Sequence, residues 1–199
     1  MSIKSILGSI SVLVAIIGYI PYIRNILIGK TKPHALSWLV WAALSAIAFA
    51  VQVINNGGPG AWLLGVTAAV TLSIFLMSLK KGETSILLVD WLSLLLAVTA
   101  LLLWFFTKNP LASIVLISIT DMVGGFFPTF RKSFHKPHQE TISLYLIYAL
   151  SILFSLAALR RFDIINVLYP ATFVLVNLCM VIFLYVRRRQ LSSHHHPKL

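Results

Sequence analysis

Acidic residues are scarce in this sequence, which has five Asp and Glu residues against sixteen Lys and Arg residues among 199. Between Pro33 and Leu79 there is no charged residue of either sign. A soluble domain must cover its surface with polar side chains, so this lack of charge excludes a soluble globular protein. Because 59% of the residues are hydrophobic and the mean hydropathy is +0.93, we predict an all-α integral membrane protein.

Several functional signatures are missing from the sequence as well. The one cysteine, Cys179, excludes an internal disulfide. The sequence has no nucleophile paired with a base, no metal-ligand spacing and no phosphate-binding loop, so we expect no enzyme activity, no cofactor and no metal site. There is no soluble basic domain, and the net charge of +11 therefore indicates contact with anionic membrane lipid rather than with nucleic acid.

Seven stretches are apolar and long enough to cross a bilayer as helices, which takes about 20 residues. They are residues 6–23, 35–54, 61–79, 85–106, 111–130, 141–159 and 164–186. The turn sequence at residues 55–60, Asn-Asn-Gly-Gly-Pro-Gly, divides the longest uncharged run into two helices. The loops between these stretches are short and leave no room for a soluble catalytic domain.

The Lys and Arg residues indicate how the chain is oriented. Twelve of the sixteen fall on one side of the seven-span arrangement: Arg24, Lys30, Lys32, Lys80, Lys81, Arg131, Lys132, Lys136, Arg187, Arg188, Arg189 and Lys198. The others are Lys4, Lys108, Arg160 and Arg161. Because cytoplasmic loops are enriched in Lys and Arg, we expect the N-terminus outside and the C-terminus in the cytoplasm. The compact loops favour a prokaryotic plasma membrane.

A motif of Gly, Pro and Arg occurs twice. Its first copy is Gly18, Pro21 and Arg24 followed by Lys32-Pro33-His34, and its second is Gly125, Pro128 and Arg131 followed by Lys136-Pro137-His138. The two copies match the first three spans with the last three. Because a single span connects them, the first and fifth spans cross the membrane in the same direction and the repeats are parallel. We therefore predict repeats at 1–82 and 108–190, a linker helix at 83–107 and a disordered cytoplasmic tail at 191–199.

This repeated pattern on a plan of three, one and three helices resembles the PQ-loop superfamily, and within it the SWEET and SemiSWEET sugar transporters. The resemblance covers nearly the whole chain, with Tyr22 and Thr129 in place of the motif glutamine. It implies a tetrad of the four motif prolines near the pore and binding asparagines on the third and seventh spans. Asn177 fits the seventh span, whereas Val70 occupies the matching position in the third.

Pro21 and Pro128 are expected to weaken the first and fifth spans. A proline removes the hydrogen bond to the carbonyl four residues earlier, and a neighbouring glycine adds flexibility. A static kink would explain either proline alone, but two prolines at matching positions favour a hinge for alternating access. The predicted hinge set also takes in the neighbouring glycines and the two loop prolines: Gly18, Pro21, Pro33, Gly125, Pro128 and Pro137.

Asp121 is the most informative polar residue, because a charge near the middle of a span costs about 2.5–3.5 kcal/mol. It is either a carboxylate that contacts substrate or couples transport to protons, or a packing residue hydrogen-bonded to Ser118, Thr120 or Asn177. Its counterpart in the first repeat is Val14. Asn177 is likewise either a substrate ligand or a polar link between helices.

Aromatic residues recur at matching positions in the second and sixth spans. Trp41 and Tyr145 each lie eight residues after a loop proline and offer stacking faces for a ring-shaped substrate. Trp38, Trp62 and Tyr169 are expected in the interfacial belt. The predicted substrate site is therefore made of Asp121, Asn177, Trp41 and Tyr145.

Two functions from different classes fit these features. The first is a small-solute transporter for a sugar or a small amino-acid-like solute, with proton coupling through Asp121. The second is a non-transporting membrane receptor or accessory protein that binds a partner through its basic loops, residues 24–34 and 131–138. A cavity at the centre of the helices would favour the first function, and a solidly packed core the second. A homo-oligomer is compatible with both.

Overall fold

The computed structural model describes residues 2–83, 88–107 and 109–193, and within these ranges the chain is almost entirely helical and forms no strand. The all-α prediction is therefore confirmed. The elements are α1 (Ile3–Leu27), α2 (Ala35–Ile54), the 3-10 turn η1 (Gly58–Ala61), α3 (Trp62–Lys81), α4 (Leu88–Thr107), α5 (Pro110–Thr120), the π-helical turn η2 (Asp121–Phe126), α6 (Phe127–His135), the 3-10 turn η3 (Pro137–Gln139), α7 (Ile142–Ala157) and α8 (Ile164–Ser193).

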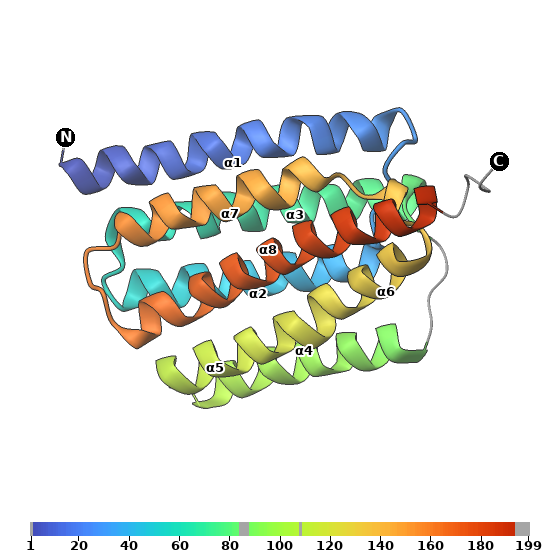
Figure 1. Ribbon diagram of the computed structural model, residues 1–199. Helices are drawn as coiled ribbons and strands as arrows, with labels where there is room; N and C mark the ends of the chain where they lie inside the picture. The colour runs from blue at the N-terminus through green and yellow to red at the C-terminus, as the bar shows by residue number, and fades with distance from the viewer. Residues whose placement is uncertain (1, 84–87, 108, 194–199) are drawn as a thin grey trace.

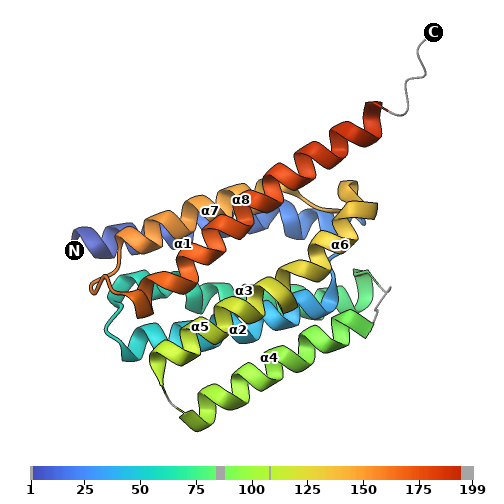
Figure 2. The ribbon, with the colours of Figure 1, turned by 60° about the horizontal axis from the view of Figure 1, so that its bottom comes forward.

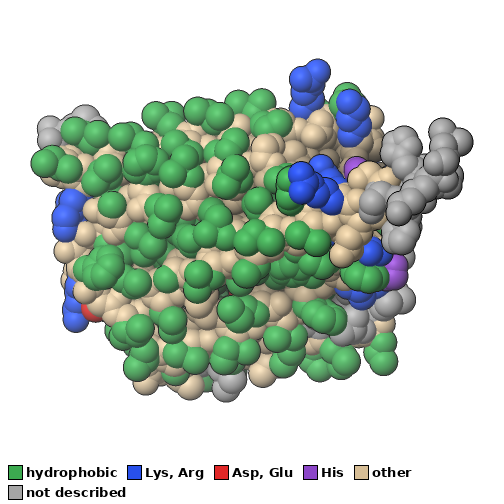
Figure 3. Space-filling model, in the orientation of Figure 1, with side chains coloured by type: hydrophobic (Ala, Val, Ile, Leu, Met, Phe, Trp, Pro, Cys, Tyr) green, Lys and Arg blue, Asp and Glu red, His purple; other side chains and the backbone are tan. Residues whose placement is uncertain are grey.

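The outer surface of the helices is apolar. Figure 3 shows hydrophobic side chains along the length of the molecule, with Lys and Arg side chains gathered at its two ends. Five helical segments are long and apolar enough to cross a membrane: Ile3–Leu27, Ala35–Ile54, Gly58–Lys81, Pro110–His135 and Ile164–Ser192. Such a surface suits lipid and not water, so the chain is an integral membrane protein. The count of seven spans stays a prediction, since it also needs α4 and the shorter α7.

Six helical segments form a closed ring (Figures 1 and 2). Around it, α1 packs against α7, α7 against α8, α8 against α5, α5 and η2 against α2, α2 against α3, and α3 against α1. The buried apolar cluster lies among these segments. The remaining long helix, α4, lies outside the ring, against α2, α5 and η2.

Local sequence determines where several helices begin and end. Ser2 caps α1 by accepting a hydrogen bond from the backbone N–H of Ser5 at 3.2 Å, and Asn109 caps α5 in the same way immediately before Pro110. Gly29 follows α1 with a φ of 74°, a left-handed conformation that glycine adopts without strain. These short polar and glycine-containing segments let consecutive helices reverse direction within a few residues.

The loops gather at two ends of the ring. At one end, which we call the basic end, the C-terminus of α3 meets that of α1, where Lys81 Nζ donates to the Leu27 carbonyl at 2.8 Å. The α6–α7 loop and the C-terminal part of α8 also lie there. At the other end, the hairpin end, the α2–α3 turn meets the α7–α8 loop, and the Asn55 amide donates to the Asp163 carboxylate at 3.2 Å.

The fifth predicted span departs from a regular α-helix. Its α-helical part ends at Thr120, and in η2 the chain widens, with the backbone N–H of Phe127 bonded to the carbonyl of Met122 five residues earlier. We expected the weak point at Pro128, but the irregular stretch begins at Asp121. Pro128 cannot donate a backbone hydrogen bond and two glycines precede it, so a widened turn is easily accommodated on its N-terminal side. In contrast, α1 continues as an α-helix through Pro21.

The predicted ends of the chain segments agree only in part with the observed ones. Helix α2 begins and ends at the predicted residues, whereas α8 continues to Ser193, three residues into the predicted tail. After Pro170, which lies inside α8, no glycine or proline occurs before Pro197, so nothing local ends the helix earlier. Residues 84–87 of the predicted linker, Lys108, and residues 194–199 of the tail lie outside the described part of the chain.

Candidate functional site

A cavity of about 20 Å³ lies inside the ring, bordered by side chains from α1, α2, α3, η2, α7 and α8. All eleven side chains of its wall are buried: Tyr19, Trp38, Trp41, Thr67, Thr71, Phe126, Leu144, Tyr145, Tyr148, Phe173 and Asn177. Space of this size holds about one water molecule. The cavity is therefore too small for a solute in this conformation and must widen before it can hold one.

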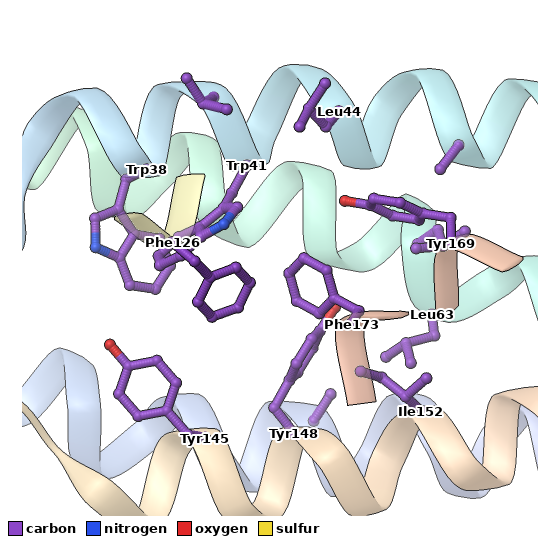
Figure 4. Close-up of a cluster of buried hydrophobic side chains, with 14 of the residues drawn as sticks. Trp38, Trp41, Leu44, Leu63, Phe126, Tyr145, Tyr148, Ile152, Tyr169 and Phe173 are labelled. Carbon is purple, nitrogen blue, oxygen red and sulfur yellow. The ribbon is translucent and has the colours of Figure 1, made fainter. Parts of the chain in front are cut away.

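Aromatic rings make up most of the cavity wall, and six of them form a continuous chain, of which Figure 4 labels all but Tyr19. Successive ring centroids are 4.9–5.7 Å apart along the order Trp38, Trp41, Phe126, Phe173, Tyr148 and Tyr19. These distances are typical of tilted and edge-to-face contacts. Trp38 is only 3% exposed, so its expected place in the interfacial belt is wrong; the same correction applies to Tyr169, while Trp62 is 43% exposed.

Two polar side chains of the wall, Thr71 and Asn177, have oxygen atoms that can accept further hydrogen bonds. The Thr71 hydroxyl donates to the Thr67 carbonyl at 2.7 Å, which leaves its oxygen as an acceptor. The Asn177 amide nitrogen donates to the Phe173 carbonyl at 2.8 Å, and no described hydrogen bond uses the Asn177 side-chain oxygen. The Thr67 and Tyr148 hydroxyls bond each other at 2.6 Å.

Three of the four predicted substrate residues, Trp41, Tyr145 and Asn177, lie in the cavity wall, and the fourth, Asp121, lies beside it. A methyl group placed on Gly125 would be 2.4 Å from Trp41 Nε1 and 2.8 Å from Asp121 Oδ1. The indole N–H and the carboxyl therefore face each other across Gly125, although their geometry falls short of a hydrogen bond. The indole of Trp41 separates Asp121 from the cavity.

Asp121 belongs to a group of buried polar atoms without hydrogen bonds. Its side chain is 1% exposed, and among the described residues Asp121 Oδ1, Trp41 Nε1, Ser45 Oγ and Tyr169 Oη have no hydrogen-bond partner. Asp121 also interacts electrostatically with Tyr169 of α8, whose hydroxyl points toward the Trp41 side of the cluster in Figure 4. Ser45 approaches Tyr169 as Trp41 approaches Asp121, in both cases short of a full hydrogen bond. Buried polar groups are normally bonded, so these loosely paired atoms are available to a ligand, ion or water.

The packing alternative for Asp121 required a bond to a neighbouring polar side chain. Ser118 instead donates to the Ile114 carbonyl at 2.7 Å, and Asn177 donates within α8. No described hydrogen bond joins Asp121 to Thr120. The three partners that the sequence suggested therefore do not explain why a carboxyl group is buried here.

At the basic end, a buried ion pair lies directly behind the cavity wall. Lys132 of α6 is 5% exposed and pairs with Glu140, which is 3% exposed. Lys132 also donates to the carbonyl of Lys32 in the α1–α2 loop, so it joins the two motif loops. The Tyr145 hydroxyl donates to the other Glu140 oxygen at 2.9 Å. Tyr145 thus connects the cavity wall to this ion pair, which no sequence motif indicated.

The residues predicted as hinges lie near the cavity and at the basic end. Gly125 borders Trp41 and Asp121, and a methyl group on Gly18 would be 2.9 Å from Ile147 Cγ2 of α7, so both glycines allow close packing. The two loop prolines and Pro128 are buried, and Pro21 is half-buried.

Thr129, in the place of the motif glutamine, lies 3.1 Å from the Ser37 hydroxyl of α2.

Comparison of the chain with protein-family models, with curated proteins and with solved structures finds no match. Arguments about function therefore depend on the geometry above. Sequence reasoning missed Tyr19, Thr67, Thr71, Phe126 and Phe173 in the cavity wall. For Thr67 and Thr71 a signal was present, because polar residues four apart share one face of a helix.

The Lys132–Glu140 pair is expected to show strong energetic coupling. Removing one partner leaves the other charge buried and unpaired, so Lys132→Met or Glu140→Leu alone should destabilise the protein by about 3–5 kcal/mol. The double variant should lose much less than the sum of the single losses. Thermal unfolding in detergent measures the stability of the wild type, the two single variants and the double variant. A control cycle on Lys136 and Glu83, where the lysine is 48% exposed, should give a coupling below about 1 kcal/mol. Additive losses at Lys132 and Glu140 would contradict the assignment.

Proposed function

We propose that this protein is a small-solute transporter that works by alternating access between two groups of three helices. The observation that carries the proposal is the cavity between α1, α2, α3 on one side and η2, α7, α8 on the other. Binding sites are concave, mostly apolar and provided with a few polar groups, as this cavity is. Its small volume corresponds to an occluded state without solute.

The helix contacts support the proposed repeat. The packing of α1 on α7 has a counterpart in that of η2 and α5 on α2. The contact of α2 with α3 corresponds to that of α7 with α8, and α1 with α3 corresponds to α5 with α8. Exchanging the first three spans with the last three thus reproduces the contacts. This agrees with parallel repeats, a linker at α4, seven spans and the resemblance to PQ-loop transporters. The basic end would face the cytoplasm.

Each end of the ring would open in turn. At the basic end, opening requires separation of Lys132 from Glu140 or from the α1–α2 loop. At the hairpin end, it requires separation of α2 and η1 from α7 and α8, where the Gln52 amide donates to the Asn166 carbonyl and the Ser155 hydroxyl to the Gly60 carbonyl, both at 2.7 Å. The widened turn η2 supplies a flexible point between them.

The near-solid packing around the cavity is the observation that favours the alternative function, a receptor or accessory protein. In that case the exposed basic side chains of the loop at residues 24–34, such as Arg24 and Lys30, would bind a partner. The second loop is less available, since Lys132 and Lys136 are paired within the protein. Reversing the charges of Arg24 and Lys30 would then abolish function, and filling the cavity would not.

Filling the cavity should abolish transport. Thr71→Leu adds apolar volume inside the wall, and overpacking of about 1–3 kcal/mol corresponds to roughly a 5- to 150-fold loss of uptake. Leu72→Phe is the matched control, because Leu72 is 47% exposed on the outer surface and should tolerate the added volume. Proteoliposomes assayed with radiolabelled sugars, amino acids and amines provide the measurement. Full uptake by a folded Thr71→Leu protein would contradict a transport path through this cavity.

Proton coupling is expected to depend on Asp121. The titratable groups that face it are Tyr148 of α7 and Tyr169 of α8, with Trp41 and Ser45 of α2 nearby, and no Lys, Arg or His among the described residues neutralises it. Asp121→Asn should lower uptake driven by an imposed pH gradient and flatten its dependence on external pH. Uptake at two pH values, with and without the gradient, tests this. Transport at the full rate with unchanged pH dependence would rule out the coupling role.

A further inference from the structure

The charged side chains around the cavity differ in whether they are paired. Among the residues that the structure describes, the cavity wall contains no Lys, Arg or His. Of the acidic side chains that the structure describes, Glu83, Glu140 and Asp163 each form an ion pair with a basic residue, whereas Asp121 forms none. Glu140 is bonded to the wall residue Tyr145 but is balanced by Lys132, whereas the carboxyl of Asp121, beside the wall residue Trp41, is balanced by no basic side chain within the described part of the protein.

The wall suits a ligand that donates hydrogen bonds and carries positive charge. The Thr71 and Asn177 side-chain oxygens are acceptors with no bond from a described donor. The six connected aromatic rings offer electron-rich faces, to which ammonium groups are attracted electrostatically.

We infer that the transported solute is a small organic monocation, a primary amine or a quaternary ammonium compound, held by the aromatic wall with Asp121 as its counter-charge. The inference rests on the proposed transport function and specifies its substrate class. It excludes anions, because the wall has no cationic side chain. It also disfavours amino acids, whose carboxylate would be buried without a partner.

The position of Trp41 explains how Asp121 can act without lining the cavity. The indole N–H faces the carboxyl across Gly125, and the ring itself borders the cavity. A cation on the ring would therefore be separated from the carboxylate by one indole, in a region where water screens charges weakly. When the cation leaves, the carboxyl can take up a proton and remain neutral in the membrane, which would exchange cations for protons on one group.

The inference is tested with pairs of ligands that have nearly the same shape and differ in charge. Choline is compared with its uncharged carbon isostere, dimethylbutanol, and ethanolamine with ethylene glycol. Binding to the full-length protein in lipid nanodiscs is followed by tryptophan fluorescence, since two tryptophans line the cavity. The wild-type protein should bind the charged member of at least one pair about tenfold more tightly than the neutral member.

Three variants test which side chains cause the preference for the charged ligand. Asp121→Asn should remove the preference for the charged ligand, because it keeps the shape of the side chain and deletes its charge. Asp163→Asn is the matched control, since this carboxylate lies in the α7–α8 loop at the hairpin end, and should keep the preference. Trp41→Phe should reduce it about threefold by weakening the ring that carries the cation. The Trp41→Phe variant is an independent test of the cation site if Asp121→Asn does not fold.

The outcomes separate this inference from the proposed function. Equal binding within both pairs, no binding of any of the four ligands, or an unchanged preference in Asp121→Asn overturns the cation site. Uptake of a neutral sugar or an amino acid by the same preparation would then leave the transport function standing with another substrate. If the protein neither takes up any labelled solute nor binds any ligand, both the cation site and the transport function are contradicted.

Discussion

Inside a membrane, a buried polar group must find its partner within the protein, because lipid offers none and leaving the group unpaired costs several kcal/mol. Most of this structure obeys that constraint. Lys132, Glu140 and Tyr145 bond one another at the basic end, and the hydroxyls of Thr71, Ser118 and Ser155 bond backbone carbonyls. Asp121 and the polar atoms around it do not, and they lie next to the cavity. Unbonded buried polar atoms also occur at the two ends, such as Gln52 Oε1 at the hairpin end and Ser133 Oγ at the basic end, so the group around Asp121 is distinguished by its carboxyl and by its place beside the cavity.

The same constraint connects the irregular helix geometry to function. In η2 the backbone departs from the α-helical pattern beside Asp121, and Gly125 allows the Trp41 indole to approach the carboxyl. π-helical turns often occur at functional sites, since they displace side chains from the regular helical register. The second half of the chain therefore combines an unpartnered carboxyl with a flexible backbone. The first half, with a regular α1, contributes aromatic wall and shape.

Much of the fold could be predicted because its signals are local. Apolar runs and the turn at residues 55–60 located most of the helices within a few residues, although α8 ends seven residues beyond its predicted span. The motif spacing also predicted Trp41 and Tyr145 as site residues, and the family resemblance predicted Asn177. All three lie in the wall of one cavity. Other features depend on contacts distant in sequence. The burial of Trp38 and the pairing of Glu140 with Lys132 follow from how the ring closes. That Asp121 lies behind Trp41 could not be predicted either, since it depends on the π-helical turn and on contact between η2 and α2.

The central claim is that the cavity opens to each end of the ring in turn. A cysteine at Thr71 in a protein whose native Cys179 is replaced by serine tests this most directly, because Thr71 is 2% exposed in the closed conformation. Membrane-impermeant thiol reagents are added to oriented proteoliposomes from outside or inside. The account predicts that the cysteine reacts from either side and that a transported solute alters both rates. A cysteine that reacts from neither side would contradict it and indicate a permanently packed core.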